Sequence, residues 1–405
     1  MVSPILDQRS YVGFARPVEM GALLRLGPEP LSVSWSNLSR QVQAAGVGVA
    51  GEGGGEVEWL SEVPPGGPPG PWFGGWAFDA RRSWPGFDDE RWILPEVLAW
   101  WDGQRAWQAA FGPRGTPVTV LQSRLAAVRE VAPSGVVRPA TRAHGNPEAW
   151  AELVNTALGA IEARRFSKVV VARVIDVAAT EPLPERAILK ALEARHPQCW
   201  TFLVRGRDGR AFVGASPETL CEASEQVFFT EALAGTSAFG QGGTLLRSDK
   251  ERREHASVVD GIREALGPFA ANVEHPETPQ VKVLANVDHL MTPVRARLKA
   301  GVDPLVVAKA LHPTPAVAGR PRQPSLEWLL GHEAFARGWY AGVVGAMGPG
   351  GLTLAVALRS ALLEGARASV FVGAGIVEGS QASSEWLETE RKARAMLPAL
   401  GVTDG

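Results

Sequence analysis

The sequence predicts a mixed α/β fold, of the α+β kind, because strand-like apolar runs and amphipathic helical segments both recur along its 405 residues. The apolar run Phe166–Val174 is typical of a buried strand. By contrast, Pro147–Arg164 repeats apolar residues at spacings of three and four, which indicates a helix. The length allows one large α/β domain or two ordinary ones.

Composition argues against several classes of partner. The net charge of -2 does not indicate the excess of basic residues that is typical of nucleic-acid-binding proteins. No window reaches the roughly 18 uninterrupted apolar residues of a membrane helix. The first residues lack the basic and long apolar regions of a signal peptide. Cys199 and Cys221 form neither a metal-binding spacing nor a disulfide framework, so we expect a cytoplasmic location.

Residues 1–140 are expected to be a β-rich N-terminal part of the fold, with few groups for acid–base chemistry. The strands expected there are Leu31–Trp35, Val47–Ala50, Trp72–Phe78, Trp92–Trp101, Ala106–Phe111 and Pro117–Leu121. The motif Phe73–Asp79 (FGGWAFD) is interpreted as a glycine-kinked core strand. A polar seam at Val131–Asn146 separates this part from residues 145–398, which carry the motifs that suggest chemistry.

The stretch Val370–Leu397 is the centre of the candidate site. Its apolar run ends at Gly373 and Gly375, where missing side chains allow backbone N–H groups to approach a ligand closely. The helix that follows carries two carboxylates and a lysine along one face: Glu385, Glu388 and Lys392. This combination suits a small anionic substrate held through a divalent metal. A β-turn followed by a solvated, salt-bridged helix is the simpler alternative.

Two further residues suggest acid–base chemistry. Lys168 lies inside an apolar strand, where burial of its ammonium group is costly unless the group is paired or functional. The alternative is an edge-strand lysine whose head lies in water. Glu218 follows Pro217, which ends a strand because it cannot donate a ladder hydrogen bond, so the glutamate could face a cleft.

A second acidic pair lies on the predicted helix Asp249–Leu266. Glu251 and Glu254 share the face that continues into apolar residues, so this face looks inward rather than into solvent. Two carboxylate pairs on two helices, without a Cys/His set, favour hard oxygen ligation of Mg²⁺.

The remaining strands place other polar groups. Trp339–Val344 and Leu352–Leu358 are expected to pair, with Ala368–Val372 as the last strand of the same sheet. Tyr340 and Arg359 would lie at strand ends. The other polar positions of interest are Gly235 with Thr236, whose hydroxyl suits a carboxylate, and His289, expected before a strand or turn.

Taken together, residues 145–398 resemble the chorismate-utilising enzymes, and within that family they are most similar to isochorismate synthases. The motifs that carry the resemblance are KVVVAR, GASPE, TEALAGT, DKERREH, VDHLMTP, LHPTPAVAG, YAGVVGA, VALRS, GAGIV and SEWLETERK. The first 140 residues resemble the family only through FGGWAFD. The resemblance implies two facing, mostly antiparallel sheets with helices outside and the substrate between them.

The resemblance also implies a role for each matched residue. Lys168 matches the general base that takes a proton from water attacking C2 of chorismate, and Glu218 matches the acid that protonates the departing C4 hydroxyl. The matched Mg²⁺ ligands are Glu254 and Glu388, with Glu251 and Glu385 beside them. Positions that hold the substrate carboxylates match Gly235, Thr236, Arg359, Gly373, Gly375 and Lys392. His289 and Tyr340 match residues that line the site.

The implied chemistry needs two opposite pKa shifts. A lysine base must lose its proton well below a pKa of about 10.4, and nearby Mg²⁺, Arg359 and desolvation would all lower it. Glu218 must stay protonated, which calls for a pKa raised in a dry pocket.

Alternatives inside and outside the family can be weighed by residue. Lys168 argues against anthranilate and aminodeoxychorismate synthases, which use ammonia and lack this base; Ala234 also argues against the latter. Pro315-Ala316 replaces the Val-Thr usual in salicylate synthases, which eliminate pyruvate from isochorismate. A silent chorismate-binding subunit is the alternative from another class. We expect chorismate as the small-molecule partner, no amidotransferase subunit, and a monomer or homodimer.

Overall fold

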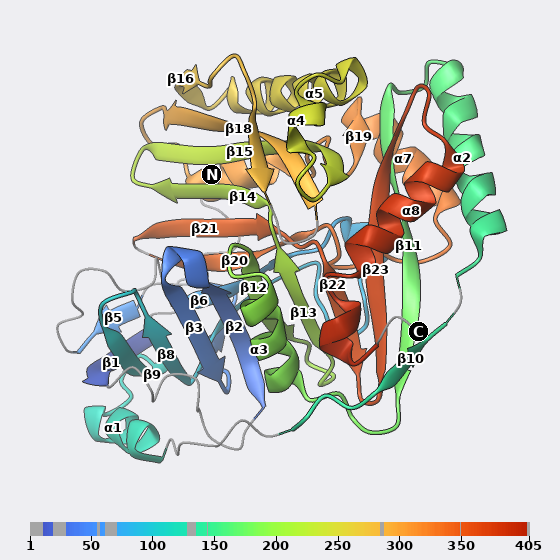
Figure 1. Cartoon of the computed structure of the whole chain (residues 1–405). Helices are drawn as coiled ribbons and strands as arrows, with labels where there is room; N and C mark the ends of the chain where they lie inside the picture. Colours follow the sequence, from blue (N-terminus) through green and yellow to red (C-terminus); the bar gives the residue numbers. More distant parts are fainter. Residues whose placement is uncertain are drawn as a thin grey trace.

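The computed structural model describes residues 11–18, 30–54, 57–60, 71–127, 135–143, 145–283, 287–348 and 350–402. These residues form two mostly antiparallel β-sheets that face each other, with helices on the outside (Figure 1). The expected α+β fold with two facing sheets is confirmed.

The larger sheet contains strands from both ends of the chain. Its order is β10 (Ala140–Arg142), β11 (Lys168–Ala179), β23 (Arg367–Val377), β22 (Ser360–Glu364), β13 (Ala211–Ser216), β12 (Trp200–Arg205), β2 (Leu31–Asn37), β3 (Val42–Val47), β8 (Val97–Trp101), β9 (Ala106–Pro113), β1 (Tyr11–Val18) and β5 (Val57–Trp59), with β19 (Gly319–Arg320) paired to β11. Only the β1–β5 pair is parallel among the described strands.

The smaller sheet has the same mixed origin. Its order is β16 (Ala270–Glu274), β18 (Val287–Leu298), β15 (Val227–Ala238), β14 (Thr219–Ser224), β21 (Gly351–Val356), β20 (Val343–Gly348), β6 (Trp72–Trp76), β7 (Glu90–Leu94) and β4 (Gly51–Glu52), with β17 (Gln280–Val283) paired to β18. Since β2 pairs with β12 and β6 with β20, residues 1–140 contribute to both sheets. The division at the seam stays a prediction; residues 131–134 and 144 lie outside the described residues.

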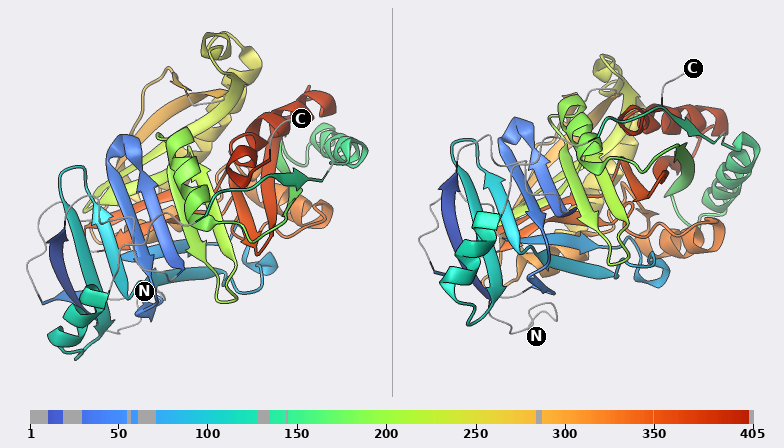
Figure 2. Two further views of the ribbon diagram at one scale, coloured as in Figure 1. Left: turned by 60° about the horizontal axis from the view of Figure 1, so that its bottom comes forward. Right: turned by 90° about the horizontal axis from the view of Figure 1, so that it is seen from below.

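Helices cover the outer surfaces. They are α1 (Val118–Ala127), α2 (Pro147–Glu162), α3 (Glu185–Arg195), α4 (Gly242–Leu245), α5 (Asp249–Leu266), α6 (Pro304–Leu311), α7 (Arg322–His332) and α8 (Ala382–Ala393), with short 3₁₀ turns at Leu38–Arg40, Ala80–Arg82 and Leu397–Leu400. Helix α5 runs along the smaller sheet, whereas α2 and α8 lie side by side at one end of the larger sheet (Figures 1 and 2). Helix α1 lies at the opposite end.

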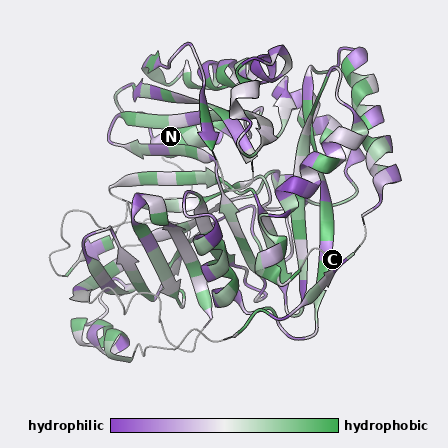
Figure 3. Ribbon diagram, viewed as in Figure 1, coloured by the Kyte–Doolittle hydropathy of each residue, from purple (hydrophilic) through white to green (hydrophobic). Residues whose placement is uncertain are grey.

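The larger sheet is buried on both faces in its centre. Phe202 and Phe212 point into the core between the sheets, where they share one apolar cluster with Trp92 of the smaller sheet. Leu203 and Val213, their neighbours in sequence, belong to a second cluster beneath α3. The alternation follows from the two-residue period of a strand. Figure 3 shows the same pattern, with hydrophobic strands inside and hydrophilic residues on the outer helices.

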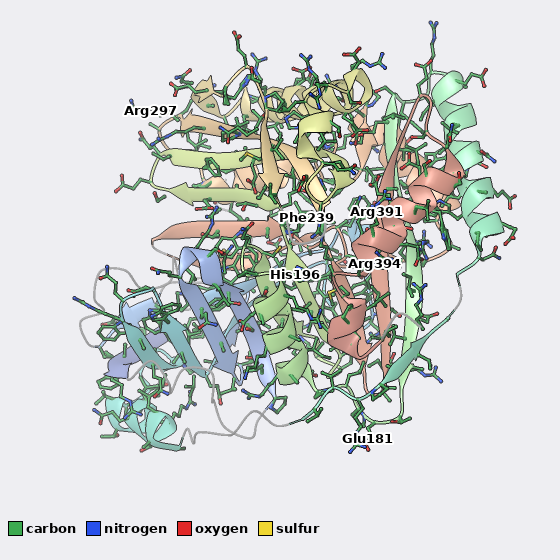
Figure 4. All side chains as sticks on the ribbon, in the orientation of Figure 1. Glu181, His196, Phe239, Arg297, Arg391 and Arg394 are labelled. Atoms are coloured by element: carbon green, nitrogen blue, oxygen red, sulfur yellow. The ribbon has the colours of Figure 1, made fainter. Side chains whose placement is uncertain are left out.

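Side-chain caps begin helices α5 and α2, whereas α8 begins after Gln381 without a side-chain cap. Ser248 caps α5, because its hydroxyl accepts a hydrogen bond from the Glu251 N–H at 3.3 Å. Asn146 caps α2 in the same way, and Pro147 occupies its first turn. Helix α8 presents Arg391 and, just beyond its end, Arg394 (Figure 4). The predicted helix Asp249–Leu266 is confirmed.

Several expected elements were wrong. Pro117–Leu121 is not a strand but the start of α1, because Leu121 and Leu125 are buried one helical turn apart while Val120 is exposed. The single strand Trp92–Trp101 is instead two strands, β7 and β8, in different sheets. The strand expected at Val47–Ala50 ends at Val47.

Two errors bear on the site. The strand expected at Ala368–Val372 is part of β23, which joins β11 and β22 in the larger sheet rather than β20 and β21. A local apolar pattern does not encode which strand it pairs with. His289 lies within β18 rather than before a strand.

Candidate active site

A cavity between the two sheets, near α5 and α8, brings the predicted residues together. Its empty volume, counted to its open mouth, is about 840 Å³. The predicted residues that line it are Lys168, Glu218, Gly235, Glu254, His289, Tyr340, Arg359, Gly373, Gly375, Glu388 and Lys392. They come from both sheets and both helices, so the fold assembles the site from segments far apart in sequence.

Lys168 begins β11 and is buried. Its side chain is 3% exposed, and its Nζ atom lies 2.8 Å from Glu254 Oε1 on α5. Strand β11 is not a sheet edge there, since it pairs with both β19 and β23. The edge-strand alternative for this lysine was therefore wrong, and the ammonium group has the partner that its burial requires.

Glycines in β23 make room for this ion pair. A β carbon at Gly375 would lie 3.2 Å from both Glu254 Oε1 and Lys168 Cε. At Gly373 it would lie 2.9 Å from the Tyr340 hydroxyl oxygen. The missing side chains thus allow the cavity to reach the backbone of β23, as the sequence predicted.

Glu218 lies between β13 and β14, where Pro217 interrupts the ladder. Its N–H donates to Ser216 Oγ at 3.2 Å, and the serine hydroxyl donates in turn to the Val356 carbonyl at 2.5 Å. Burial, followed by the negative charge of Glu231, raises the pKa of Glu218 to about 8. The carboxyl group is therefore protonated at neutral pH, the state that a proton donor requires.

His289 and Arg359 form a second polar group in the cavity. His289 Nδ1 donates to the Gly235 carbonyl at 3.2 Å, so Nε2 faces the Arg359 guanidinium at 3.4 Å. Burial and the adjacent Arg359 hold the pKa of His289 well below its usual range, so the imidazole is neutral. Gly235 has φ +79°, in a β-bulge of β15. The Thr236 backbone pairs with His289, but its side chain lies outside the described residues.

The acidic helix residues divide into two groups. Glu254 and Glu388 line the cavity, whereas Glu251 and Glu385 do not. Glu251 lies behind Gly235, where its Oε2 atom would be 3.2 Å from an added β carbon, and Glu385 is a buried residue of α8 itself. Glu388 pairs with Lys392 at 2.7 Å, and Lys392 also donates to the Gly373 carbonyl at 2.9 Å.

Carboxylates from two helices on one cavity fit a hard cation such as Mg²⁺, whose remaining ligands would be water and substrate oxygens. Within the described part of the chain, no three His, Cys, Asp or Glu side chains converge into a metal cluster by themselves. Both cavity-facing carboxylates point to a lysine in this structure.

Further charged residues, not predicted from the sequence, lie in and around the cavity. Arg337 lines it and is 4% exposed, in an ion pair with Glu333. Glu231 and Lys282 form another pair behind Glu218. The rule that singled out Lys168, a charge inside an apolar run, also applies to Glu231 in FFTEALAG.

Similarity to known proteins establishes the family. The chain belongs to the chorismate-binding enzymes, since the family model described as "Chorismate binding enzyme" matches residues 67–401. Its relatives include proteins named as isochorismate synthases. The "Salicylate biosynthesis isochorismate synthase" of Pseudomonas aeruginosa is 37% identical over 362 residues, which cover 82% of this chain and 74% of that protein.

Two further comparisons extend the similarity. "Isochorismate synthase MenF" of Pasteurella multocida is 38% identical over 263 residues, covering 62% of this chain and 61% of that protein. The solved structure of MenF from Escherichia coli matches the fold with a TM-score of 0.83 at 24% identity, over 98% of this chain and 96% of that one. No helix among the described residues is long and apolar enough to span a membrane.

Proposed function

We propose that this chain is an isochorismate synthase, an isomerase that converts chorismate to isochorismate. The observation that carries the proposal is that one cavity contains two buried groups of opposite chemical character. These are Lys168 and Glu218, whose pKa is raised to about 8. A base and a protonated acid in the same site suit the addition of water at one carbon and the loss of hydroxide, as water, at another.

In the proposed mechanism, Lys168 accepts a proton from the water that attacks C2, and a new C2–O bond forms. Both ring double bonds shift by one position, the C4–O bond breaks, and Glu218 donates its proton to the departing hydroxyl, which leaves as water. The net change moves a hydroxyl group without oxidation or reduction. Arg359 and Lys392 supply positive charge for the two substrate carboxylates, since both line the cavity.

We assign Glu254 and Glu388 as the residues that would hold Mg²⁺, with Glu251 and Glu385 in supporting positions. When bound, the cation would offset the negative charge of the dianionic substrate. Glu254→Ala or Glu388→Ala should abolish turnover while the variants remain folded, as judged by circular dichroism. Near-normal turnover of either variant at limiting Mg²⁺ would contradict the assignment.

Isochorismate is favoured over salicylate as the final product. Ala316, where salicylate synthases usually have a threonine, lines the cavity. The product would feed menaquinone or siderophore biosynthesis; the similar enzyme of known structure from Escherichia coli is described as menaquinone-specific. We further propose a cytoplasmic enzyme, a monomer or homodimer, that uses water and has no amidotransferase subunit.

The test is product identification after incubation with chorismate and Mg²⁺, with and without ammonia. We expect an equilibrium mixture of isochorismate and chorismate. The same mixture should form whether the reaction starts from chorismate or from isochorismate. Accumulation of salicylate with pyruvate would favour the lyase alternative, and an aminated product would favour the ammonia-using branch. The absence of any turnover would favour a silent chorismate-binding protein.

A further inference from the structure

The turn that carries Glu218 is held on both sides by one ion pair, in which Glu231 is buried and Lys282 is partly buried. Lys282 Nζ lies 2.6 Å from Glu231 Oε1 and also donates to the Pro217 carbonyl at 2.8 Å. The same Glu231 oxygen accepts a hydrogen bond from the Thr219 N–H at 3.1 Å. The backbone groups immediately before and after Glu218 are therefore both bound by this pair.

The pair is costly where it lies. The Glu231 side chain, in β15, is 5% exposed, and that of Lys282, in the flanking strand β17, is 21% exposed. A buried ion pair rarely stabilises a fold more than well-packed apolar residues of similar volume. Stability alone therefore does not explain two opposite charges at this position.

We propose that Glu231 and Lys282 are positioning residues, which hold the Pro217–Thr219 turn so that the Glu218 carboxyl group faces the reacting centre. This inference rests on the proposed function, because it assumes that Glu218 is the proton donor. It adds two residues from β15 and β17 that do not line the cavity themselves. The resemblance assigned no role to either of them.

The charges of the pair also act on Glu218 in opposite directions. Glu231 raises its pKa, whereas Lys282 lowers it. The other cations that lower it are Lys168 on β11 and Lys392 on α8, and Arg359 and neutral His289 line the same cavity. Removal of one member of the pair should therefore move the proton affinity of Glu218 in a direction that depends on which member is lost.

The experiment compares Glu231→Gln with Lys282→Met in the full-length protein. The amide keeps the shape and can still accept the Thr219 N–H bond, so Glu231→Gln removes mainly charge. We expect the alkaline limb of the pH profile of kcat/KM to move to lower pH by about one unit in Glu231→Gln, because a negative charge that raises the pKa of Glu218 is lost. In Lys282→Met the limb should move to higher pH by a similar amount, because a positive charge is lost. In Lys282→Met, turnover should also fall across the whole pH range, because the Pro217 carbonyl loses its donor.

Matched variants separate positioning from general damage. Lys299→Met removes a lysine that likewise donates to a proline carbonyl, that of Pro268, outside the cavity, and should leave the profile unchanged. Lys282→Arg keeps the charge and should restore the wild-type limb. Alkaline limbs that coincide with the wild type, or that move in the same direction in both variants, would overturn the inference.

A second measurement does not depend on catalysis. Carboxyl ¹³C NMR of glutamate-labelled protein, with Glu218→Gln to assign the signal, reports the titration of Glu218 without substrate. The same opposite shifts are expected. Because this titration needs no turnover, it decides the inference even if the product assay goes against the proposed function.

Discussion

At the residue scale, Lys168 is the group whose environment differs most from that of an ordinary surface lysine. It is buried, it is paired with Glu254, and it faces the substrate cavity. Lys168→Ala should lower turnover by about 10²- to 10⁴-fold, which is the usual contribution of a positioned general base to the rate. Steady-state kinetics with chorismate and Mg²⁺ check this result. Lys190→Ala, which alters an exposed lysine of α3, should leave turnover unchanged.

If Lys168→Ala keeps more than about a tenth of wild-type turnover, the loss is smaller than that expected for removal of a base, and the assignment is wrong. Unfolding must be monitored in parallel, because the variant leaves the Glu254 carboxylate without its lysine.

The protonation of the Glu218 carboxyl group sets an expected dependence of activity on pH. Its pKa of about 8 means that the carboxyl group holds a proton below pH 8 and loses it as pH rises. Activity that needs this proton should be level near neutrality and fall about tenfold per pH unit above pH 8 in kcat/KM. Glu218→Gln should lower turnover strongly and remove this alkaline limb. An unchanged alkaline limb in the variant would assign it to another group.

The same shift affects stability with a definite sign. The folded pKa of Glu218 is above its ordinary value of 4.5, so the folded state binds the extra proton in the window from 4.5 to about 8. The free energy of unfolding should therefore decrease as pH rises through that window, and Glu218→Gln should remove this contribution. Denaturant titrations at several pH values measure both trends.

Single residues were predictable where a local rule applied. A charge in an apolar strand singled out Lys168, and a proline at a strand end singled out Glu218. The same rule also points to Glu231, whereas Lys282 occupies a polar position of the short alternating strand β17 (QVKV), where a lysine is ordinary. That Lys282 reaches Glu231 depends on the register of β17 with β18 and of β18 with β15, which no local pattern encodes.

At the element scale, β23 combines a structural and a chemical role. Gly375→Ala would place a β carbon 3.2 Å from Glu254 Oε1 and Lys168 Cε, so the ion pair must shift. We expect turnover to fall about 10²-fold, as for a small misplacement of catalytic groups, with a stability loss of about 1–3 kcal/mol. Kinetics and chemical denaturation check the two effects separately.

Gly159 of α2 provides the control, because an added β carbon there meets no atom within 4 Å. Gly159→Ala should stabilise the protein by roughly 0.5–1 kcal/mol without a change in turnover. A Gly375→Ala enzyme with wild-type turnover would show that the space beside the ion pair is not needed.

Helices with a regular spacing of apolar and charged residues were predicted well, as α5 and α8 show, although only α5 of the two has a side-chain cap. Prediction failed where two signals competed. The β-branched residues Val118–Val120 indicated a strand, but the burial of Leu121 and Leu125 against the sheet selects a helix. In the run Trp92–Trp101, Pro95 and Glu96 separate strands of different sheets.

At the scale of the whole molecule, the site depends on contacts between segments distant in sequence. The sequence indicated half of the cavity residues one by one, but their convergence follows from pairing between distant segments of the chain, such as β11 with β23. Two facing sheets were implied only by family resemblance, because strand order and partner choice are set by long-range packing.

One buried arginine joins several of these distant segments. Arg337 donates to Glu333 Oε2 at 2.8 Å, to the Val170 carbonyl of β11 at 2.6 Å, and to the Val317 carbonyl at 2.9 Å. Glu333 also accepts the Ala172 N–H of β11 at 2.9 Å. The pair therefore fixes the strand of Lys168 against the loop that contains Ala316 and against the segment that precedes Tyr340.

Arg337→Met should destabilise the protein by about 3–5 kcal/mol, because it leaves the Glu333 carboxylate buried without its cation. That loss is a large fraction of the 5–15 kcal/mol typical of a folded domain, so the midpoint of denaturant unfolding should fall clearly. Arg320→Met removes a more exposed arginine, paired with the 69% exposed Glu264, and should cost less than about 1 kcal/mol. The double variant Arg337→Met/Glu333→Leu removes the unpaired charge and should regain part of the loss, although the Ala172 N–H then lacks its acceptor. Equal midpoints for Arg337→Met and Arg320→Met would show that the buried pair does not hold these segments together.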